Sequence, residues 1–335
     1  MVCNADEGEP GTFKDRVIME NDPYLVLEGI MIAAYMIGSN KAYVYIRGEY
    51  YDSINKMSHA IKTCKEAGLL GDFILGSDFS LDVEIKPGAG SYLCGEELTL
   101  IESLEGKRGY PRIKPPYPAE TGLFGKPTLV NNVETLVQIP SIIINGPDWY
   151  KSLGTEKSSG TKIFTLSGRI NKPGFFEVEM GIRLRELIFD LGGGMKNGFE
   201  FKGVLLGGAA GTFVDASMLD IPMAYETLKE KGATLGSGAV IVLDQTQSVT
   251  EMLVSILEFF KHESCGKCVP CRVGCAHLAG MCHELLNKRQ GKTEILELME
   301  KKARYMAANS LCPLGQSPIL PIRSAIQYFK KEITG

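Results

Sequence analysis

The sequence predicts three successive regions of different fold class: α/β, then α+β, then all-α. Over residues 1–150, strand and helix patterns alternate, which favours a mainly parallel, Rossmann-like sheet. Over 151–247 the elements are short and mostly β-rich, with one helix. Residues 248–335 contain no expected strand, and three or four helices fit there. Because 335 residues are too many for one ordinary core, we expect these regions to be separate domains.

The elements of the first region follow from their breakers and their apolar content. Asp22 followed by Pro23 begins a helix that Gly38 ends, since proline is favoured in a first helical turn. The proline-rich residues 110–127 are expected to be irregular. The expected strands are 41–47 and 81–86, and the further helices are 51–67 and 131–145.

The second and third regions differ in element type. β-Branched and aromatic runs predict strands over 161–167, 174–178, 201–206 and 239–243, with a helix over 183–191. The glycine-rich residues 205–211 are interpreted as a tight loop. Helical patterns predict helices over 248–263, 272–288, 292–308 and 318–332.

Composition indicates a globular protein outside the secretory route. Apolar residues make up 44%, charged residues 23%, and the net charge is −4, so no basic excess supports binding to nucleic acid or to an anionic membrane. The most apolar stretch, 24–38, contains Glu28 and is too short to span a bilayer. The N-terminal residues have no signal-peptide pattern, so we expect a cytoplasmic protein, with attachment to the periphery of a membrane complex left open.

The strongest chemical motif is a triple cysteine spacing, Cys265-x-x-Cys268-x-x-Cys271. Three thiols at this spacing can converge on one cubane, and Cys312 is the natural fourth ligand, so the motif predicts a 4Fe–4S cluster. A zinc site also accepts four thiolates, and unliganded thiols are a further alternative.

The remaining cysteines are expected to be buried rather than liganding. Nine cysteines in a chain of this length do not indicate a disulfide scaffold but metal ligands plus buried thiols in a reducing compartment. Cys275 and Cys282 fit the apolar face of a helix. His262 lies three residues before Cys265 and is expected at the surface or as a helix cap. The other isolated thiols are Cys3, Cys64 and Cys94.

Three polar segments are candidates for binding a nucleotide or flavin. Residues 4–16 read as a loop, either a solvated acidic turn or a set of carboxylates that accept hydrogen bonds from ligand hydroxyls. Residues 88–97 place glycines between a strand and a helix, where a backbone can approach a ligand closely, although the spacing is not Gly-x-Gly-x-x-Gly. Asn131 and Asn132 can cap a helix, or bind a phosphate or the edge of a flavin ring.

These motifs occur in one order that is similar to a known family. Asn-Ala-Asp-Glu at 4–7, Gly-Glu-Pro-Gly at 8–11, Tyr-Leu-Cys-Gly-Glu-Glu at 92–97, Asn-Asn-Val-Glu-Thr at 131–135 and the triple-cysteine segment 264–274 resemble the NADH-oxidising flavoprotein subunit of respiratory complex I. Diaphorase subunits of NAD-linked and electron-bifurcating hydrogenases and of formate dehydrogenases share this core. The resemblance implies a Rossmann-like FMN domain, a β-grasp (ubiquitin-like) domain and a helical bundle that holds the cluster.

The resemblance also implies a reaction, NADH giving a hydride to FMN, which then passes single electrons to the 4Fe–4S cluster and to partner subunits. The implied partners are a thioredoxin-like 2Fe–2S subunit and a further iron–sulfur subunit. Glu7 and Glu9 would border the flavin and nicotinamide, and acidic residues near the ribose would favour NADH over NADPH. The implied FMN residues are Asn4, Asp6, Glu7, Tyr92, Gly95, Glu96, Asn131, Asn132 and Thr135, and the implied NADH residues are Glu9, Glu97, Lys114 and Tyr117.

One family feature lies outside the 335 residues. The family carries a glycine-rich flavin loop of the Gly-Arg-Gly-Gly-x-Gly-Phe-Pro type upstream of the Asn-Ala-Asp-Glu motif. A truncated gene model, a split polypeptide or a missing N-terminal part is the expected explanation. The alternative function is therefore an electron-relay or scaffold subunit that keeps the cluster and has no flavin.

Overall fold

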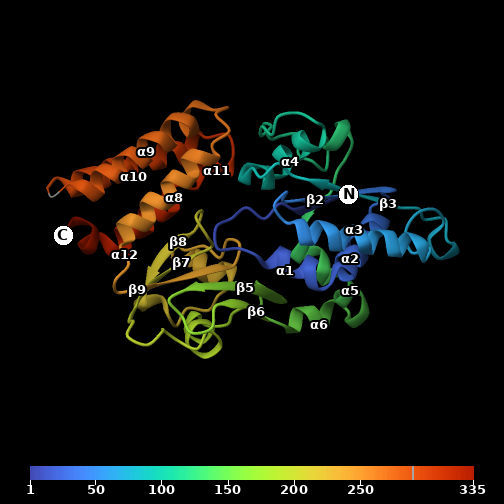
Figure 1. The fold of residues 1–335 in the computed structure, drawn as a ribbon, viewed down its shortest axis with the longest axis horizontal. Helices are drawn as coiled ribbons and strands as arrows, with labels where there is room; N and C mark the ends of the chain where they lie inside the picture. Colours follow the sequence, from blue (N-terminus) through green and yellow to red (C-terminus); the bar gives the residue numbers. More distant parts are fainter. Residues whose placement is uncertain (289) are drawn as a thin grey trace. The chain divides into compact units, whose positions relative to one another are not determined.

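The computed structural model describes residues 1–288 and 290–335, which form two compact units. The first unit comprises Met1–Gly8 and Phe13–Tyr150, and the second comprises Glu9–Thr12 and Lys151–Gly335. Figure 1 follows the chain through the elements of both units. The regions expected over 151–247 and 248–335 therefore lie in the same compact unit.

The first unit contains a four-stranded sheet in which all strands are parallel, as the sequence predicted. The strand order is β3-β2-β1-β4. Two strands were missed, because β1 and β4 are short and carry no alternating pattern. The prediction that residues 4–16 form a loop is wrong at both ends, since Asn4 and Ala5 belong to β1 and Lys14 begins a helix. The strands are β1 (Val2–Ala5), β2 (Lys41–Ile46), β3 (Asp82–Pro87) and β4 (Val130–Asn132).

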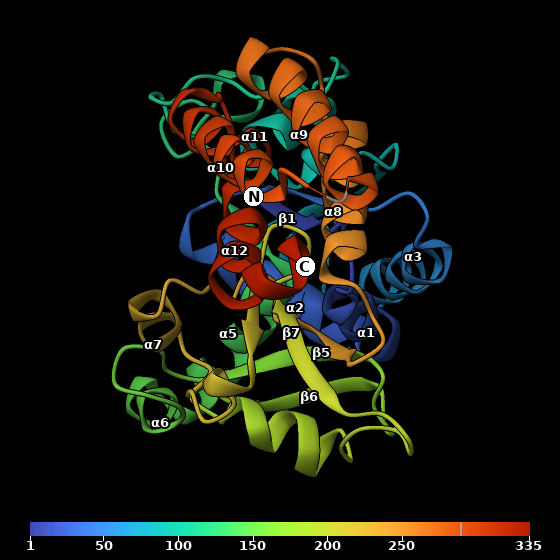
Figure 2. The ribbon, with the colours of Figure 1, turned by 90° about the vertical axis from the view of Figure 1, so that its left-hand side faces the viewer.

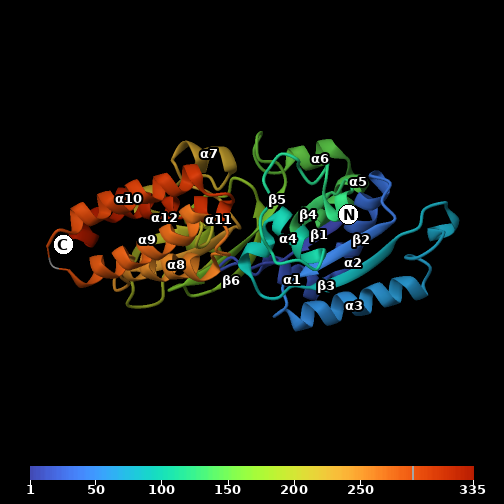
Figure 3. The ribbon, with the colours of Figure 1, turned by 90° about the horizontal axis from the view of Figure 1, so that it is seen from above.

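Helices cover both faces of this sheet (Figures 1 and 3). On the side of α4, Val2 and Tyr45 pack with Leu98 and Ile101, while α2 and α3 lie on the opposite side. The expected helix over 131–145 begins later, at Val133, because Asn131 and Asn132 end β4. The helices are α1 (Lys14–Asn21), α2 (Pro23–Met36), α3 (Tyr51–Glu66), α4 (Glu97–Leu104), α5 (Val133–Asn145) and α6 (Pro147–Ser152).

The second unit contains a five-stranded mixed sheet of order β6-β5-β9-β7-β8. β5 and β9 are parallel, and the other neighbours are antiparallel. The expected loop over 205–211 is confirmed as the turn between β7 and β8, although Leu205 and Leu206 still belong to β7. β8 was missed. The strands are β5 (Thr161–Gly168), β6 (Gly174–Glu179), β7 (Phe201–Leu206), β8 (Thr212–Asp215) and β9 (Ala239–Asp244).

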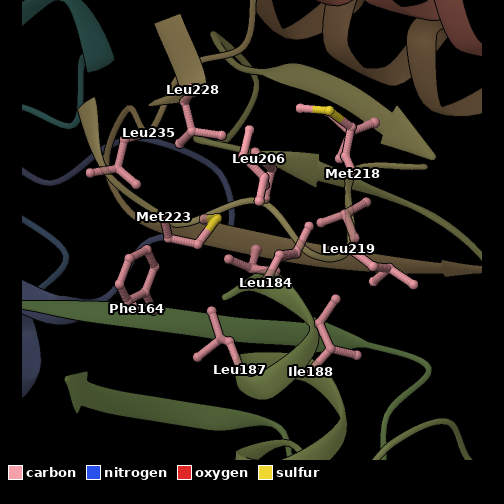
Figure 4. Packing of buried hydrophobic residues seen from close by; sticks show 14 of the residues in the cluster. Phe164, Leu184, Leu187, Ile188, Leu206, Met218, Leu219, Met223, Leu228 and Leu235 are labelled. Atoms are coloured by element: carbon pink, nitrogen blue, oxygen red, sulfur yellow. The ribbon is translucent and has the colours of Figure 1, made fainter. Parts of the chain in front are cut away.

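The core of this sheet lies between its strands and the segments that cross it (Figure 4). Phe164 and Leu206 from the strands meet Leu187 and Ile188, and all four are fully buried. The helix expected over 183–191 is a π-helical turn, Glu186–Leu191, and the short α7 (Tyr225–Glu230) was not predicted.

The last part of the chain is helical, and the four expected helices are confirmed (Figure 2). α12 packs on β8, where Ser324 Oγ accepts a hydrogen bond from the amide of Phe213 at 2.8 Å. α9 begins three residues earlier than expected, and the short α11 was missed. The helices are α8 (Val249–Glu263), α9 (Val269–Asn287), α10 (Lys292–Asn309), α11 (Pro313–Gln316) and α12 (Ile319–Thr334).

Among residues 1–288 and 290–335, no helix has the length and apolar character needed to cross a membrane.

Candidate functional site

The order of the parallel sheet defines a ligand-binding edge in the first unit. The chain builds β1, β2 and β3 outward in one direction and then returns to place β4 on the other side of β1. Ligands of open parallel sheets bind outside the carboxyl ends of the strands at such a switch point. Asn4 near the end of β1 and Asn132 at the end of β4 stand at this point, and Asn132 Nδ2 donates to the Asn4 carbonyl at 3.2 Å.

The loop after β3 meets the loop after β1 at this edge. Asn4 Nδ2 donates to the Gly95 carbonyl at 2.9 Å, which ties the end of β1 to the turn Tyr92–Gly95. A Cβ at Gly8 would lie 3.1 Å from the Cα of Tyr92, so glycine permits this close approach. A Cβ at Gly95 would lie 3.2 Å from the Asp6 carbonyl. The structure therefore brings together Asn4, Asp6, Tyr92 and Gly95, as the sequence predicted.

A buried charge network beneath this edge was missed by the sequence reasoning. Lys14, at the start of α1, is 5% exposed, and its Nζ lies 2.6 Å from Asp15 Oδ1 and 3.2 Å from Glu134 Oε2. The same Nζ donates to Asn132 Oδ1 at 2.9 Å, and Asn132 Nδ2 donates to Asp15 Oδ2 at 2.7 Å. Burial lowers the pKa of Lys14, but the carboxylates of Asp15 and Glu134 outweigh it and raise that pKa. Lys14 stands inside the segment singled out from the sequence, yet no local signal marks it as buried.

Glu7 is held inside the protein. Its side chain is 5% exposed and accepts hydrogen bonds from the amides of Asp15 at 3.0 Å and Arg16 at 3.2 Å and from the Tyr50 hydroxyl at 3.1 Å. Burial, followed by repulsion from Asp15, raises the pKa of Glu7 to about 7. Glu7 therefore fixes the start of α1 behind the binding edge.

The residues predicted for NADH form one ion-paired group and two separate positions. Lys114 Nζ lies 2.9 Å from Glu96 Oε1 and 2.6 Å from Glu97 Oε1. Burial lowers the pKa of Lys114, but these two carboxylates raise it overall. Tyr117 is 53% exposed, so its ring is available for stacking. Glu9 belongs to the second unit, where its Oε1 accepts a hydrogen bond from the Ala210 amide at 3.0 Å.

Two predicted FMN residues lie on either side of β4 and the start of α5. Asn131 is half-buried in β4, and Thr135 is exposed on the first turn of α5. The chemistry of the edge fits a polyhydroxyl flavin cofactor: glycines permit close approach of the backbone, and carboxylates and amides supply acceptors and donors for hydroxyl groups.

The four predicted cluster cysteines converge in the second unit. Cys265 follows α8, Cys268 is the N-cap residue of α9, Cys271 lies in the first turn of α9, and Cys312 is the N-cap residue of α11. Hydrogen bonds from Cys275 first, then from Ser264 and Cys268, lower the pKa of Cys271 to about 6. Burial raises the pKa of Cys312 to about 11, and the neighbouring Cys271 and Cys265 raise it further.

The packing around these thiols fits a cubane cluster. A Cβ at Gly315 would lie 2.8 Å from the Cβ of Cys271 and 2.5 Å from Ser310 Oγ, so only glycine lets α11 close over Cys271. In the part of the chain that the structure describes, no three His, Cys, Asp or Glu side chains are gathered for a single metal ion. A single zinc ion needs its sulfur ligands at about 2.3 Å, whereas a cubane distributes four thiolates over four irons.

The other cysteines and His262 are placed as expected. Cys3, Cys64, Cys94, Cys275 and Cys282 are all buried, and Cys275 and Cys282 lie on the inner face of α9. His262 is exposed in the last turn of α8. Cys275 differs from the expectation in one respect, because its Sγ lies 3.9 Å from Cys271 Sγ and so borders the cluster site.

Three family models match successive parts of the chain. Residues 1–141 match the Nuo51 FMN-binding domain, residues 162–243 match the SLBB domain, and residues 251–335 match the NADH-ubiquinone oxidoreductase-F iron-sulfur binding region. The last match contains all four predicted cluster cysteines, and it supports the cluster over the zinc alternative.

Similar proteins cover nearly the whole chain. The second F subunit of the NADH-quinone oxidoreductase of Rhizobium meliloti is 45% identical over 99% of this chain and 79% of its own length. The HndC subunit of the NADP-reducing hydrogenase of Solidesulfovibrio fructosivorans is also 45% identical, over 99% of this chain and 67% of its own. A chain of the NAD+-reducing [NiFe]-hydrogenase in the H2-reduced state matches with a TM-score of 0.90 and 37% identity, and this chain spans 55% of it. The protein therefore belongs to the family of NADH-quinone oxidoreductase F subunits, which combine an FMN-binding domain with a 4Fe–4S binding region.

Proposed function

We propose that this chain is the NADH-oxidising module of a larger redox complex and carries FMN and one 4Fe–4S cluster. The observation that carries this proposal is the meeting of Asn4, Gly95 and Asn132 at the switch point of the parallel sheet. These residues come from three distant stretches, each singled out from the sequence for flavin binding. Bound FMN supplies the conversion between a two-electron hydride donor and a one-electron acceptor.

The residues of the switch-point edge would hold the flavin. Asp6, Tyr92 and Gly95 lie where the loops after β1 and β3 touch, so they would contact the cofactor directly. Asn131, Thr135 and Glu96 would add polar contacts around it. Asn132 and Glu7 spend their side chains on protein partners, which supports a role in positioning the edge rather than in direct contact.

The NADH residues would act through charge and stacking. Glu96, Glu97 and Lys114 form a compact charged group, and its two carboxylates would accept hydrogen bonds from ribose hydroxyls. Tyr117 would stack on the adenine ring. Glu9 would border the nicotinamide. A 2′-phosphate near these carboxylates would be repelled, which favours NADH over NADPH.

The helical residues 248–335 would hold the cluster as the exit for electrons, through Cys265, Cys268, Cys271 and Cys312. We assign residues 1–150 as a Rossmann-like FMN domain and 151–247 as a β-grasp domain, supported by the parallel sheet and by the SLBB match. The partners would be a thioredoxin-like 2Fe–2S subunit and a further iron–sulfur subunit. Relatives named for quinone-linked and hydrogenase complexes are equally similar, at 45% identity, so either kind of complex fits.

The test is to purify the chain anaerobically and to measure flavin, iron and the absorbance spectrum before and after adding NADH. We expect FMN, about four irons per chain and bleaching of the flavin absorbance by NADH. Iron without flavin, together with no response to NADH, would contradict the proposal and favour an electron-relay subunit.

A pair of variants separates specific from general loss of flavin. Asn4→Ala removes the amide that ties β1 to Gly95, so the FMN content is expected to fall while the iron content stays. Asn145→Ala removes an exposed amide at the end of α5 and is expected to leave both contents unchanged. Equal FMN content in the two variants would argue against the switch-point edge as the flavin site.

A further inference from the structure

Cys271 is in contact with two further side chains that each carry a proton on oxygen or sulfur. Ser264 Oγ lies 3.3 Å from Cys271 Sγ, and Cys275 Sγ lies 3.9 Å from it. Cys271 is 4% exposed and Cys275 is 1% exposed, so water does not compete freely for these contacts. Neither Ser264 nor Cys275 belongs to the predicted ligand set.

Ligation of iron fixes the direction of both contacts. A cysteine bound to iron is a thiolate without a proton, so Cys271 Sγ can only accept hydrogen bonds. Ser264 and Cys275 are then the donors. Ser264 is the C-cap residue of α8, and Cys275 lies one turn beyond Cys271 on α9, so two helices aim donors at one sulfur.

The packing keeps donors and acceptor in place. A Cβ at Gly315 would lie 2.8 Å from the Cβ of Cys271, so α11 leaves this ligand no room to move away. A hydrogen bond in a buried, low-dielectric site has a larger electrostatic effect than the same bond in water.

We infer that Ser264 and Cys275 are positioning residues that donate hydrogen bonds to Cys271 Sγ and thereby raise the reduction potential of the 4Fe–4S cluster. This inference rests on the proposed function, because it requires the cluster to be bound. One electron entering the cluster increases the negative charge on its thiolates, and donors stabilise that reduced state more than the oxidised one. No bond to Cys271 forms or breaks, and both protons stay on Ser264 and Cys275.

The test is an EPR-monitored redox titration of the loaded protein and its variants, each with its iron content measured. Ser264→Ala and Cys275→Ala each remove one donor, and Cys275→Ser restores one with a hydroxyl. Cys282→Ala is the matched control, since this buried thiol on the same helix points to the Thr250 carbonyl at 3.9 Å instead of to the cluster.

Each alanine variant is expected to lower the equilibrium constant for one-electron reduction by about threefold to tenfold, where tenfold corresponds to 59 mV. The double variant is expected to shift further, Cys275→Ser to shift less than Cys275→Ala, and Cys282→Ala not to shift. Unchanged potentials in both alanine variants with full iron content would overturn the inference while leaving the proposed function intact. If Cys275→Ala loses iron, Ser264→Ala at the half-buried helix end decides the question alone. A wild-type protein without a cluster would instead refute the proposed function.

Discussion

The switch-point edge of the first unit and the surroundings of Cys271 in the second unit solve the problem of cofactor binding in different ways. The first is built on charge: Lys14 is buried between Asp15 and Glu134, and Glu7 lies behind them. The second is built from small neutral groups, the hydroxyl of Ser264 and the thiol of Cys275.

The difference follows from what each cofactor brings. A flavin has hydroxyl and amide groups that must exchange hydrogen bonds with the protein, so its site needs many polar groups from separate loops. A 4Fe–4S cluster is bound by four Fe–S bonds and brings its own charge, so its surroundings need only to stabilise that charge. Removing one group should therefore be decisive at the cluster and graded at the flavin edge.

The largest effect is expected from Cys312→Ala. This change removes one of four ligand bonds and leaves an iron without protein ligation, so cluster absorbance and iron content are expected to be lost. Cys282→Ala removes an equally buried thiol and is expected to retain the iron. Full iron content in Cys312→Ala would mean that the fourth ligand is a different residue.

The next largest effect is expected from Lys14→Met, which breaks the charge balance of the first unit. Without the ammonium, Asp15 and Glu134 are left buried and unpaired, which costs about 3–5 kcal/mol of unfolding free energy. Urea denaturation measures this loss. Lys62→Met is the control, because Lys62 is 74% exposed and its pairing with Glu66 contributes less than about 1 kcal/mol. Equal losses in the two variants would show that the buried network is not a structural requirement.

A smaller effect, dependent on pH, is expected from Glu7→Gln. The folded protein holds the Glu7 proton up to about pH 7, whereas the ordinary carboxyl releases it near 4.5. The folded state therefore binds more protons in this window, and the contribution of Glu7 to stability is lost as pH rises from 4.5 through 7. Glutamine removes this dependence, so the variant gains stability relative to wild type with rising pH, by about 1.4 kcal/mol per unit of pKa shift.

Urea denaturation at pH 5 and pH 7.5 measures this change. Glu66→Gln is the control, since Glu66 is 67% exposed at the surface of α3, and its stability relative to wild type is expected to stay constant between the two pH values. A constant difference for Glu7→Gln as well would show that Glu7 titrates as an ordinary carboxyl.

The comparison also explains what the sequence could predict. Cluster ligation is largely local, so the spacing of Cys265, Cys268 and Cys271 identified the site without knowledge of the fold. The start of α9 was nevertheless placed too late, although Pro270 in its first turn marks the correct start. The parallel sheet could be predicted from alternating strands and helices, because that pattern is a property of whole segments.

The flavin edge depends on contacts between distant segments, which local patterns do not contain. β1 and β4 are four and three residues long, and each is defined by its neighbours in the sheet. Lys14 looks like a surface lysine, since lysine is rarely buried, and only the approach of Asn132 and Glu134 encloses it. The role of Cys275 was missed for the same reason, because its thiol meets Cys271 only in the folded helix.

The smallest effect is expected at the edge of the first unit, in the choice between NADH and NADPH. Glu97→Gln removes one of the two carboxylates that neutralise Lys114, whose Nζ lies 2.6 Å from Glu97 Oε1. The ammonium then has charge available for a 2′-phosphate, so the ratio of NADPH to NADH turnover is expected to rise roughly fivefold, equivalent to ~1 kcal/mol for an exposed ion pair. Glu84→Gln also removes a carboxylate paired with lysines, on β3, and is expected to leave the ratio unchanged. An unchanged ratio in Glu97→Gln would move the determinant of nucleotide choice away from the Glu96, Glu97 and Lys114 group, and a graded rise would show that charge at this edge acts by increments.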